Sequence, residues 1–311
     1  MLSLRGLKKV YRGRSIPAVV DVDLDVRPGE ILGLVGLNGA GKTTTIRMAA
    51  GLSIPTAGSA SVNGLDLTRQ KAEASRHIGL VPESPSFEPG SRALNQLRYY
   101  AGFYGLRGTA AKERCAELLA QVGLPNMGRV RLRTFSQGMK KRFSLAAALL
   151  GDPEILLFDE ILSGLDPEGV LLTRNLMVEL RGKNRGILLS SHILSEVQQV
   201  ADRVAIMHQG RLIKTLARNE VETAGGATLR ITIANLDDAG MALLQTYGEV
   251  RREANTVWIS RLRVDPSAVN SELVRRNYRV TALGSDSPNL EQAFFDAVRG
   301  SPPPPSTSPP S

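Results

Sequence analysis

Cysteine and long hydrophobic runs are what this sequence most clearly lacks. Cys115 is its single cysteine, which excludes an internal disulfide and is typical of proteins in a reducing compartment. We expect its side chain to be a small buried hydrophobic group on a helix. No apolar run approaches the roughly 18 residues that a membrane-spanning helix needs, and residues 1–9 lack the apolar region of a secretory signal. These absences predict a cytoplasmic protein without a membrane span.

Aromatic side chains are also scarce, and their distribution is uneven. The chain has only 14 of them, namely seven Phe, six Tyr and one Trp. Five lie close together in the sequence: Phe87, Tyr99, Tyr100, Phe103 and Tyr104. Two interpretations fit this cluster. It could be the core of a helical subdomain, or a groove whose aromatic anchors accept a short helix from a partner subunit.

Acidic residues are fewer than basic residues in this chain. The chain has 39 Lys and Arg against 30 Asp and Glu, a net charge of +9. From Arg107 to Arg142, nine Lys and Arg stand against two Glu, a local charge of +7. Such a patch could bind nucleic acid or an anionic membrane surface, and it could equally be a solvated face.

The most informative segment that is present is rich in glycine. Residues 36–43 read Gly-Leu-Asn-Gly-Ala-Gly-Lys-Thr and match the phosphate-binding pattern G-x-x-x-x-G-K-[ST]. An apolar strand-like run, residues 31–35, precedes the segment, and a helical run, residues 44–50, follows it. Glycines let backbone N–H groups surround a polyphosphate, and the helix start adds the positive end of its dipole. The predicted ATP-binding residues here are Gly36, Leu37, Asn38, Gly39, Ala40, Gly41, Lys42, Thr43 and Thr44.

A second motif joins an apolar run to two acidic residues. Four apolar residues, 155–158, lead into Asp159 and Glu160. This is the Walker B arrangement, in which the end of a strand presents Asp159 to Mg²⁺. Glu160 would then lie beside the γ-phosphate, where it can orient or deprotonate an attacking water. In the first motif, Lys42 would reach the β- and γ-phosphates, and the Thr43 hydroxyl would ligate Mg²⁺.

The pattern along the chain predicts two folded parts. The first 220 residues alternate short apolar runs with helical stretches, as a mixed α/β domain should. Residues 18–26 alternate with period two, which predicts a half-buried antiparallel strand, whereas the runs at 155–158 and 186–190 predict buried parallel strands. A composition change at 223–227 suggests a linker.

Beyond the linker, the order of expected elements is βαββαβ. We expect a strand at 228–234, a helix at 237–247, a hairpin turning near Ala254 and Asn255, a helix at 266–277, a strand at 278–283 and a helix at 290–298. This order predicts a small ferredoxin-like module.

Between the two phosphate-related motifs lies Phe135-Ser-Gln-Gly-Met139, followed by a helical run. This segment resembles the signature loop of ABC ATPases, whose usual form is Leu-Ser-Gly-Gly-Gln. Ser136 and Gly138 match that form, whereas Phe135, Gln137 and Met139 are variants. The resemblance implies that Ser136, Gln137 and Gly138 bind the ATP held by an opposite subunit, through the Ser hydroxyl and N–H groups at a helix start.

Other landmarks resembling that family fall in order along the chain. Ser163-Gly-Leu-Asp166 looks like the D-loop, which crosses the dimer interface and brings Asp166 to the nucleotide. Ser191-His192 follows a strand and is similar to the switch histidine, which implies that His192 bonds to the γ-phosphate. Tyr11 resembles the aromatic residue that stacks on adenine.

One position departs from the family pattern. Where a Gln that touches Mg²⁺ and senses the membrane partner is usual, the run from Ile78 places Glu83. A carboxylate can still ligate Mg²⁺, and it could also change metal affinity or coupling. Some subfamilies that resemble this chain carry the same Pro-Glu pair. The implied Mg²⁺ ligands are therefore Thr43, Glu83 and Asp159.

The resemblance implies a fold class and a domain plan. We expect an α/β P-loop ABC ATPase domain with a helical signature subdomain over residues 1–222. A small α+β ferredoxin-like module for regulation or dimerisation would occupy residues 227–299. The Pro- and Ser-rich residues 300–311 cannot build a core and are predicted to be disordered.

The implied function is ATP hydrolysis that powers a separate membrane permease. The appended module and the Pro-Glu pair resemble the exporter branch, the ABC-2 type. Glu160, Lys42 and His192 are the expected catalytic residues, with ATP and Mg²⁺ as cofactors. Expected partners are a second ATPase subunit, most simply an identical one, and an integral membrane permease that holds the protein on the inner face of the membrane. Nucleic acid is not expected.

Two alternatives remain open at this point. A soluble ABC ATPase acting on ribosomes or DNA would use the +7 patch to bind nucleic acid. Such proteins usually carry two ATPase domains or a long coiled-coil insertion, and this chain has neither. An importer subunit would differ mainly in its partner and its C-terminal domain.

Overall fold

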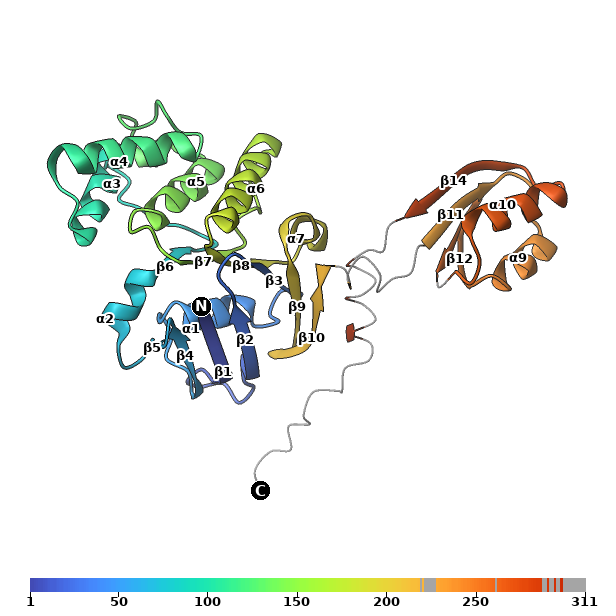
Figure 1. Ribbon diagram of the computed structural model, residues 1–311, viewed down its shortest axis with the longest axis horizontal. Helices are drawn as coiled ribbons and strands as arrows, with labels where there is room; N and C mark the ends of the chain where they lie inside the picture. The colour runs from blue at the N-terminus through green and yellow to red at the C-terminus, as the bar shows by residue number, and fades with distance from the viewer. Residues whose placement is uncertain are drawn as a thin grey trace, which may run out of the picture. The chain divides into compact units, whose positions relative to one another are not determined.

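The computed structural model describes residues 1–218, 220, 228–260, 262–286, 290, 294 and 297–298. Its chain forms two compact units, the first made of residues 1–215 and the second beginning at Leu216 (Figure 1). The expected linker at 223–227, most of the expected helix at 290–298 and the tail at 300–311 lie outside the described residues. In the part that is described, no helix is long and apolar enough to cross a membrane.

The centre of the first unit is a six-stranded sheet with the order β10-β9-β3-β8-β7-β6. Its strands are β3 (Ile31–Val35), β6 (Ile78–Val81), β7 (Ile155–Asp159), β8 (Gly186–Ser191), β9 (Arg203–His208) and β10 (Arg211–Ala217). The five strands from β9 to β6 run parallel. Every residue of β3, β7 and β8 is buried, which confirms the expectation that continuous apolar runs form the centre of a parallel sheet.

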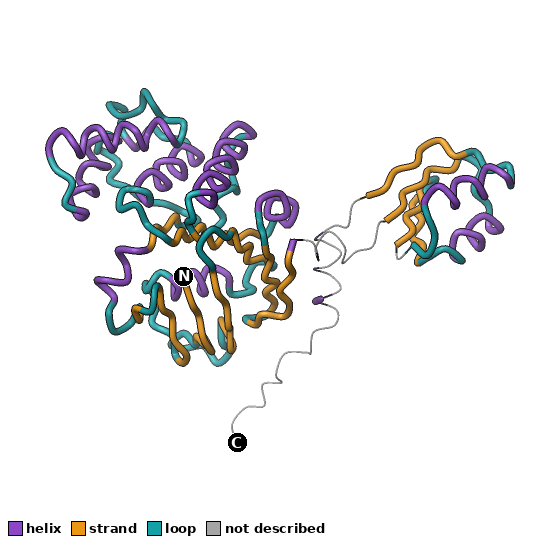
Figure 2. Tube along the Cα trace, in the orientation of Figure 1, coloured by secondary structure: helices purple, strands orange, loops and turns teal. Residues whose placement is uncertain are grey.

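A second, antiparallel sheet has the order β2-β1-β4-β5. Its strands are β1 (Leu2–Lys9), β2 (Val19–Val26), β4 (Ala57–Val62) and β5 (Leu65–Asp66). As the period-two alternation predicted, β2 pairs antiparallel with β1. Helix α1 (Lys42–Ala49) contacts β7 of one sheet and β1 and β4 of the other, so the P-loop helix lies between the two sheets (Figure 2).

The other helices cover the parallel sheet, contact the antiparallel sheet or build a separate subdomain. They are α2 (Lys71–Ala74), α3 (Ala93–Ala101), α4 (Gly108–Gln121), α5 (Gln137–Ala148), α6 (Pro167–Gly182) and α7 (Leu194–Val200), with short 3-10 turns η1 (Ser75–His77), η2 (Gly102–Tyr104) and η3 (Leu132–Thr134). Helices α3, α4 and α5 pack on one another, and α5 also contacts β6. Cys115 is buried on α4, as expected.

The aromatic cluster divides between core and surface. The Phe87 ring meets the buried Phe143 ring edge to face, with centroids 4.8 Å apart. By contrast, Tyr99 and Phe103 are 65% and 73% exposed, although their rings contact each other with centroids 5.3 Å apart. Part of the cluster is therefore core, and part is available on the surface of the helical subdomain.

The second unit has the predicted βαββαβ order. It contains β11 (Thr228–Ile233), α9 (Asp238–Gln245), β12 (Glu249–Glu253), β13 (Thr256–Ser260), α10 (Pro266–Arg275) and β14 (Val280–Asp286). The strands pair antiparallel in the order β12-β13-β11-β14, which is the ferredoxin-like arrangement. Its own core includes Leu229, Ile231, Val257, Ile259 and Leu273.

Candidate active site

The P-loop follows β3 and its shape depends on glycine. Gly41 caps α1 in the left-handed region, with φ of 107°. A Cβ there would lie 2.5 Å from the Ala18 carbonyl oxygen, and one at Gly36 would lie 2.4 Å from the Met207 carbonyl oxygen. Backbone atoms cannot move aside as a flexible side chain can, so both positions require glycine. Helix α1 begins at Lys42, two residues earlier than predicted, because Gly41 turns the chain directly into it.

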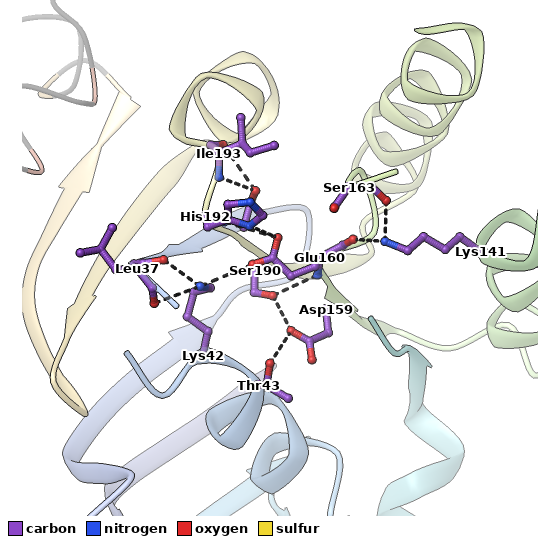
Figure 3. Close-up of polar contacts among 12 residues, drawn as sticks. Leu37, Lys42, Thr43, Lys141, Asp159, Glu160, Ser163, Ser190, His192 and Ile193 are labelled. Atoms are coloured by element: carbon purple, nitrogen blue, oxygen red, sulfur yellow. Dashed lines mark hydrogen bonds and ion pairs between the residues drawn. The ribbon is translucent and has the colours of Figure 1, made fainter. Parts of the chain in front are cut away.

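The Lys42 ammonium is buried at the centre of the site. Its side chain is 6% exposed, and its Nζ donates to the carbonyl oxygens of Gly36, at 2.7 Å, and Leu37, at 3.4 Å. The same Nζ lies 3.4 Å from Glu160 Oε1. The P-loop lysine and the acidic residue after β7 are thus brought together, as the two motifs predicted (Figure 3).

Glu160 has an unusual backbone. Its φ is +51°, a left-handed conformation that is uncommon outside glycine and asparagine. Its N–H donates to the Ser190 carbonyl oxygen and to Ser190 Oγ, both at 3.2 Å. Its carbonyl oxygen accepts from Lys141 Nζ at 2.5 Å. These bonds hold the chain where β7 ends and turn the buried carboxylate toward Lys42 rather than along the strand.

His192 completes a chain of contacts around this carboxylate. The imidazole Nδ1 lies 2.8 Å from Glu160 Oε2. The His192 side chain is 41% exposed and that of Glu160 is 7% exposed. Lysine, glutamate and histidine are therefore linked in a line from the buried P-loop to the surface, and these three are the residues assigned to catalysis.

Side-chain oxygen atoms that could bind a metal ion lie close together beside Lys42, Glu160 and His192. Thr43 Oγ1 donates to Asp159 Oδ1 at 3.2 Å, and Ser190 Oγ donates to the same oxygen at 2.7 Å. Asp159 is 3% exposed and pairs in register with Ser190 on the neighbouring strand. A hydroxyl and a carboxylate within contact distance are ligands that suit Mg²⁺. The residues present therefore fit the expected cation.

The third expected ligand, Glu83, is not joined to this pair. It follows β6, is exposed, and forms no hydrogen bond to Thr43 or Asp159. Its charge does act on the buried Lys141: burial lowers the pKa of that lysine, and the Glu83 carboxylate offsets part of the lowering. Glu83 therefore faces the edge of the site, and its role as a metal ligand stays a prediction.

The signature loop starts a helix, as predicted, and the D-loop also ends at the start of a helix. Ser136 caps α5, and its Oγ accepts from the Met139 N–H at 3.2 Å. Asp166 caps α6 by accepting from the Gly169 N–H at 3.1 Å. Ser136, Gln137 and Gly138 form no hydrogen bond with the P-loop of their own chain within the residues described. Their assigned contact with a nucleotide held by a second subunit stays a prediction.

Tyr11 lies next to the P-loop helix. Its hydroxyl is 3.4 Å from Thr44 Oγ1, and Lys9 Nζ lies 5.3 Å from the centroid of its ring. The ring is half-buried. This position beside the P-loop is compatible with the predicted adenine stacking.

Two residues of the site were not identified from the sequence. Ser190 links Asp159 to the Glu160 backbone, and Lys141 holds the Glu160 carbonyl. A signal for Ser190 existed, because it is a polar residue near the end of an apolar strand, two residues before His192. Nothing distinguished Lys141 from the other basic residues around it.

Comparison with known proteins agrees with this geometry. Residues 19–163 match the family model described as "ABC transporter". A linearmycin resistance ATP-binding protein, LnrL of Bacillus subtilis, is 31% identical over 307 residues, covering 95% of this chain and 97% of the relative. The bacitracin transport ATP-binding protein BcrA of Bacillus licheniformis is 36% identical, covering 94% of this chain and 96% of the relative.

The chain belongs to the ABC transporter family.

A solved ATP-binding subunit of an ABC transporter superposes on this ABC ATPase with a TM-score of 0.66 and 32% identity, covering 72% of this chain and 92% of that structure. The ABC ATPase fold expected from the motifs is thereby confirmed. This chain is an ATP-binding, ATP-hydrolysing subunit of a transporter, and family membership rather than any single motif decides between transport and the nucleic-acid alternative.

Proposed function

We propose that this ABC ATPase drives export through a separate membrane permease, working as one half of a head-to-tail dimer on the inner face of the membrane. The observation that carries the proposal is the contact chain from Lys42 through Glu160 to His192, which can hold and hydrolyse a nucleotide. Export is supported by relatives named for bacitracin transport and for Nod factor export.

Each residue has a role that follows from its position. Lys42 would leave the loop carbonyls to bind the β- and γ-phosphates as a compact charge. Glu160 would orient or accept a proton from the attacking water, and His192 would hold the γ-phosphate. Thr43 and Asp159 would hold Mg²⁺, which stabilises the negative charge of the transferring phosphate.

The second half of each site would come from the partner subunit. Ser136 and Gly138 at the start of α5 offer a hydroxyl and N–H groups at the positive end of a twelve-residue helix. Asp166 would cross the same interface. ATP between the two subunits would close the dimer, and hydrolysis would reopen it and move the permease.

Replacing Ser136 with arginine tests this arrangement. Ser136 is exposed and lies apart from the P-loop contacts, so the monomer should bind ATP as wild type does. The added bulk and charge should block the closed dimer and lower ATP hydrolysis by at least about 100-fold, as expected when one side of a preorganised site is lost. Calorimetry of ATP binding and sedimentation in the presence of ATP measure the two effects.

Thr109→Arg is the matched control, because Thr109 is exposed on the same subdomain, at the start of α4. It should dimerise and hydrolyse ATP normally. Loss of ATP binding by monomeric Ser136→Arg would contradict the assignment of the signature loop to the opposite subunit's nucleotide.

Glu83 offers a second test, of the metal site. If its carboxylate helps to hold Mg²⁺, Glu83→Ala should raise the Mg²⁺ concentration for half-maximal hydrolysis several-fold, while Glu83→Gln keeps an oxygen ligand and retains activity. Glu88→Ala, in the same exposed loop, serves as the control. A Mg²⁺ titration that coincides with wild type for Glu83→Ala would remove the metal-ligand role and leave coupling to the permease as the role of this residue.

The remaining parts of the chain complete the proposal. The exposed Tyr99 and Phe103 rings are suited to contact a short permease helix. The ferredoxin-like unit carries none of the phosphate-handling residues, so residues 227–299 are proposed as a separate regulatory or dimerisation module after an ATPase domain at 1–222.

A further inference from the structure

Lys141 is a buried lysine that none of the motifs claims. It follows the signature loop in the first turns of α5, and 7% of its surface is exposed. Its Nζ donates to two backbone carbonyl oxygens, that of Glu160 at 2.5 Å and that of Ser163 at 2.6 Å. Figure 3 shows the side chain reaching from α5 to the segment that follows β7.

The two carbonyls belong to different functional segments. Glu160 carries the carboxylate beside Lys42, and its left-handed backbone needs support from outside its own strand. Ser163 begins the D-loop, whose Asp166 caps the next helix. The Glu160 N–H and carbonyl are thus held from opposite sides, by Ser190 and by Lys141.

The signature loop lies at the start of α5, the helix that carries Lys141. Ser136 caps the same helix, and a Cβ on Gly138 would lie 3.4 Å from the Leu165 side chain of the D-loop. Because a helix moves as a unit, a shift of the signature loop moves Lys141 as well, and with it the carbonyl of Glu160.

Burying the ammonium has an electrostatic cost that nearby acids reduce. Burial lowers the pKa of Lys141, and the carboxylates of Glu160, Glu83, Asp159 and Glu196 offset part of that lowering. Replacing Lys141 by an apolar side chain would remove a donor from both carbonyl oxygens, so that the Glu160 oxygen keeps the longer bond from the Ser163 N–H at 3.3 Å. It would also remove a positive charge from among these acids.

We propose that Lys141 is a positioning residue that couples the two nucleotide sites to which one subunit contributes. It does so by fixing the backbone of Glu160 to the helix that carries the signature loop. This inference rests on the head-to-tail dimer proposed above. In that dimer the signature loop contacts one nucleotide and Glu160 acts on the other. Lys141 then transmits the closing of the first site to the carboxylate of the second.

Lys141→Met in the full chain tests the link. We expect unchanged ATP affinity of the monomer, since Lys42 and the P-loop are untouched. We expect kcat to fall by about 10- to 100-fold, because a misplacement of a catalytic group by about 1 Å has an effect of this size. The Hill coefficient for ATP, expected near 2 in a coupled dimer, should fall to about 1. A purely structural role would lower the melting temperature without changing the Hill coefficient.

Lys141→Arg and Lys140→Met complete the experiment. Arginine keeps the charge and the donors and should restore the Hill coefficient and most of kcat. Lys140, one residue earlier in α5, is half-buried, and its side chain forms no hydrogen bond or ion pair with the described residues, so Lys140→Met should behave as wild type. If Lys141→Met does not fold, Lys141→Gln, which offers a single shorter donor group, replaces it with the same expected losses.

A folded Lys141→Met enzyme with wild-type kcat and Hill coefficient would overturn the proposal. The Ser136→Arg result separates this failure from failure of the dimer itself. If Ser136→Arg blocks dimerisation while Lys141→Met remains cooperative, the dimer stands and only the link is wrong. If Ser136→Arg dimerises and hydrolyses ATP normally, the head-to-tail arrangement is wrong.

Discussion

Glu160→Gln should keep ATP binding and lower the rate of hydrolysis by at least about 100-fold, the lower end of what a positioned general base contributes. The amide has nearly the same shape as the carboxylate and can still accept a hydrogen bond from His192, so the site should stay folded. It cannot accept the proton of the attacking water. The nucleotide would therefore stay bound, and the variant should accumulate as an ATP-bound dimer that sedimentation can detect.

Glu113→Gln is the matched control for this substitution, because Glu113 is exposed on α4, in the helical subdomain. Its ATPase rate and its monomer–dimer equilibrium should equal those of wild type. Near-normal phosphate release by purified Glu160→Gln would remove Glu160 from its assigned role. Loss of ATP binding by the same variant would instead show that the carboxylate mainly supports the P-loop.

Lys42→Ala should have the second large effect, and it should act on binding as well as on hydrolysis. The substitution removes a buried ammonium whose proposed hydrogen bonds to phosphate would be charge-assisted, each worth about 1.5–3 kcal/mol. We expect the dissociation constant for ATP to rise by roughly 10- to 100-fold and hydrolysis to become undetectable. Calorimetry and a phosphate-release assay give the two quantities.

The same substitution leaves Glu160 buried without its cationic neighbour, so the folded state must be checked. Circular dichroism and the melting temperature should show a folded protein. Lys71→Ala, at an exposed position on α2, controls for loss of a positive charge and should bind ATP as wild type does. Wild-type affinity in Lys42→Ala would mean that the ammonium does not contact the nucleotide.

Much of this site could be predicted because its residues sit where the backbone pattern changes. The P-loop glycines, Lys42 and Thr43 follow a buried strand, and Asp159 and Glu160 end another. Parallel strands bring their carboxyl ends to one edge, so residues distant in the sequence meet there. The ferredoxin-like unit was also predictable, because α9 and α10 each begin at an Asp cap and the hairpin turns at Ala254 and Asn255.

The contacts that hold these residues in place were less accessible to sequence analysis. Ser190 meets Asp159 only because β8 pairs with β7 in one particular register. Lys141 meets Glu160 only because α5 packs close to the end of β7, and its burial has no sequence signal among so many surface lysines and arginines. Local pattern identifies the groups that do chemistry, while tertiary packing decides which groups support them.

The left-handed backbone of Glu160 has a consequence for the stability of the domain. A side chain in that conformation costs roughly 1–2 kcal/mol relative to an ordinary one, and glycine would relieve it. Glycine would also remove the carboxylate that faces Lys42 and His192. Glycine at residue 160 would therefore relieve the backbone strain only by leaving the buried Lys42 without its acidic neighbour, so the strain and the proposed catalytic carboxylate are retained together.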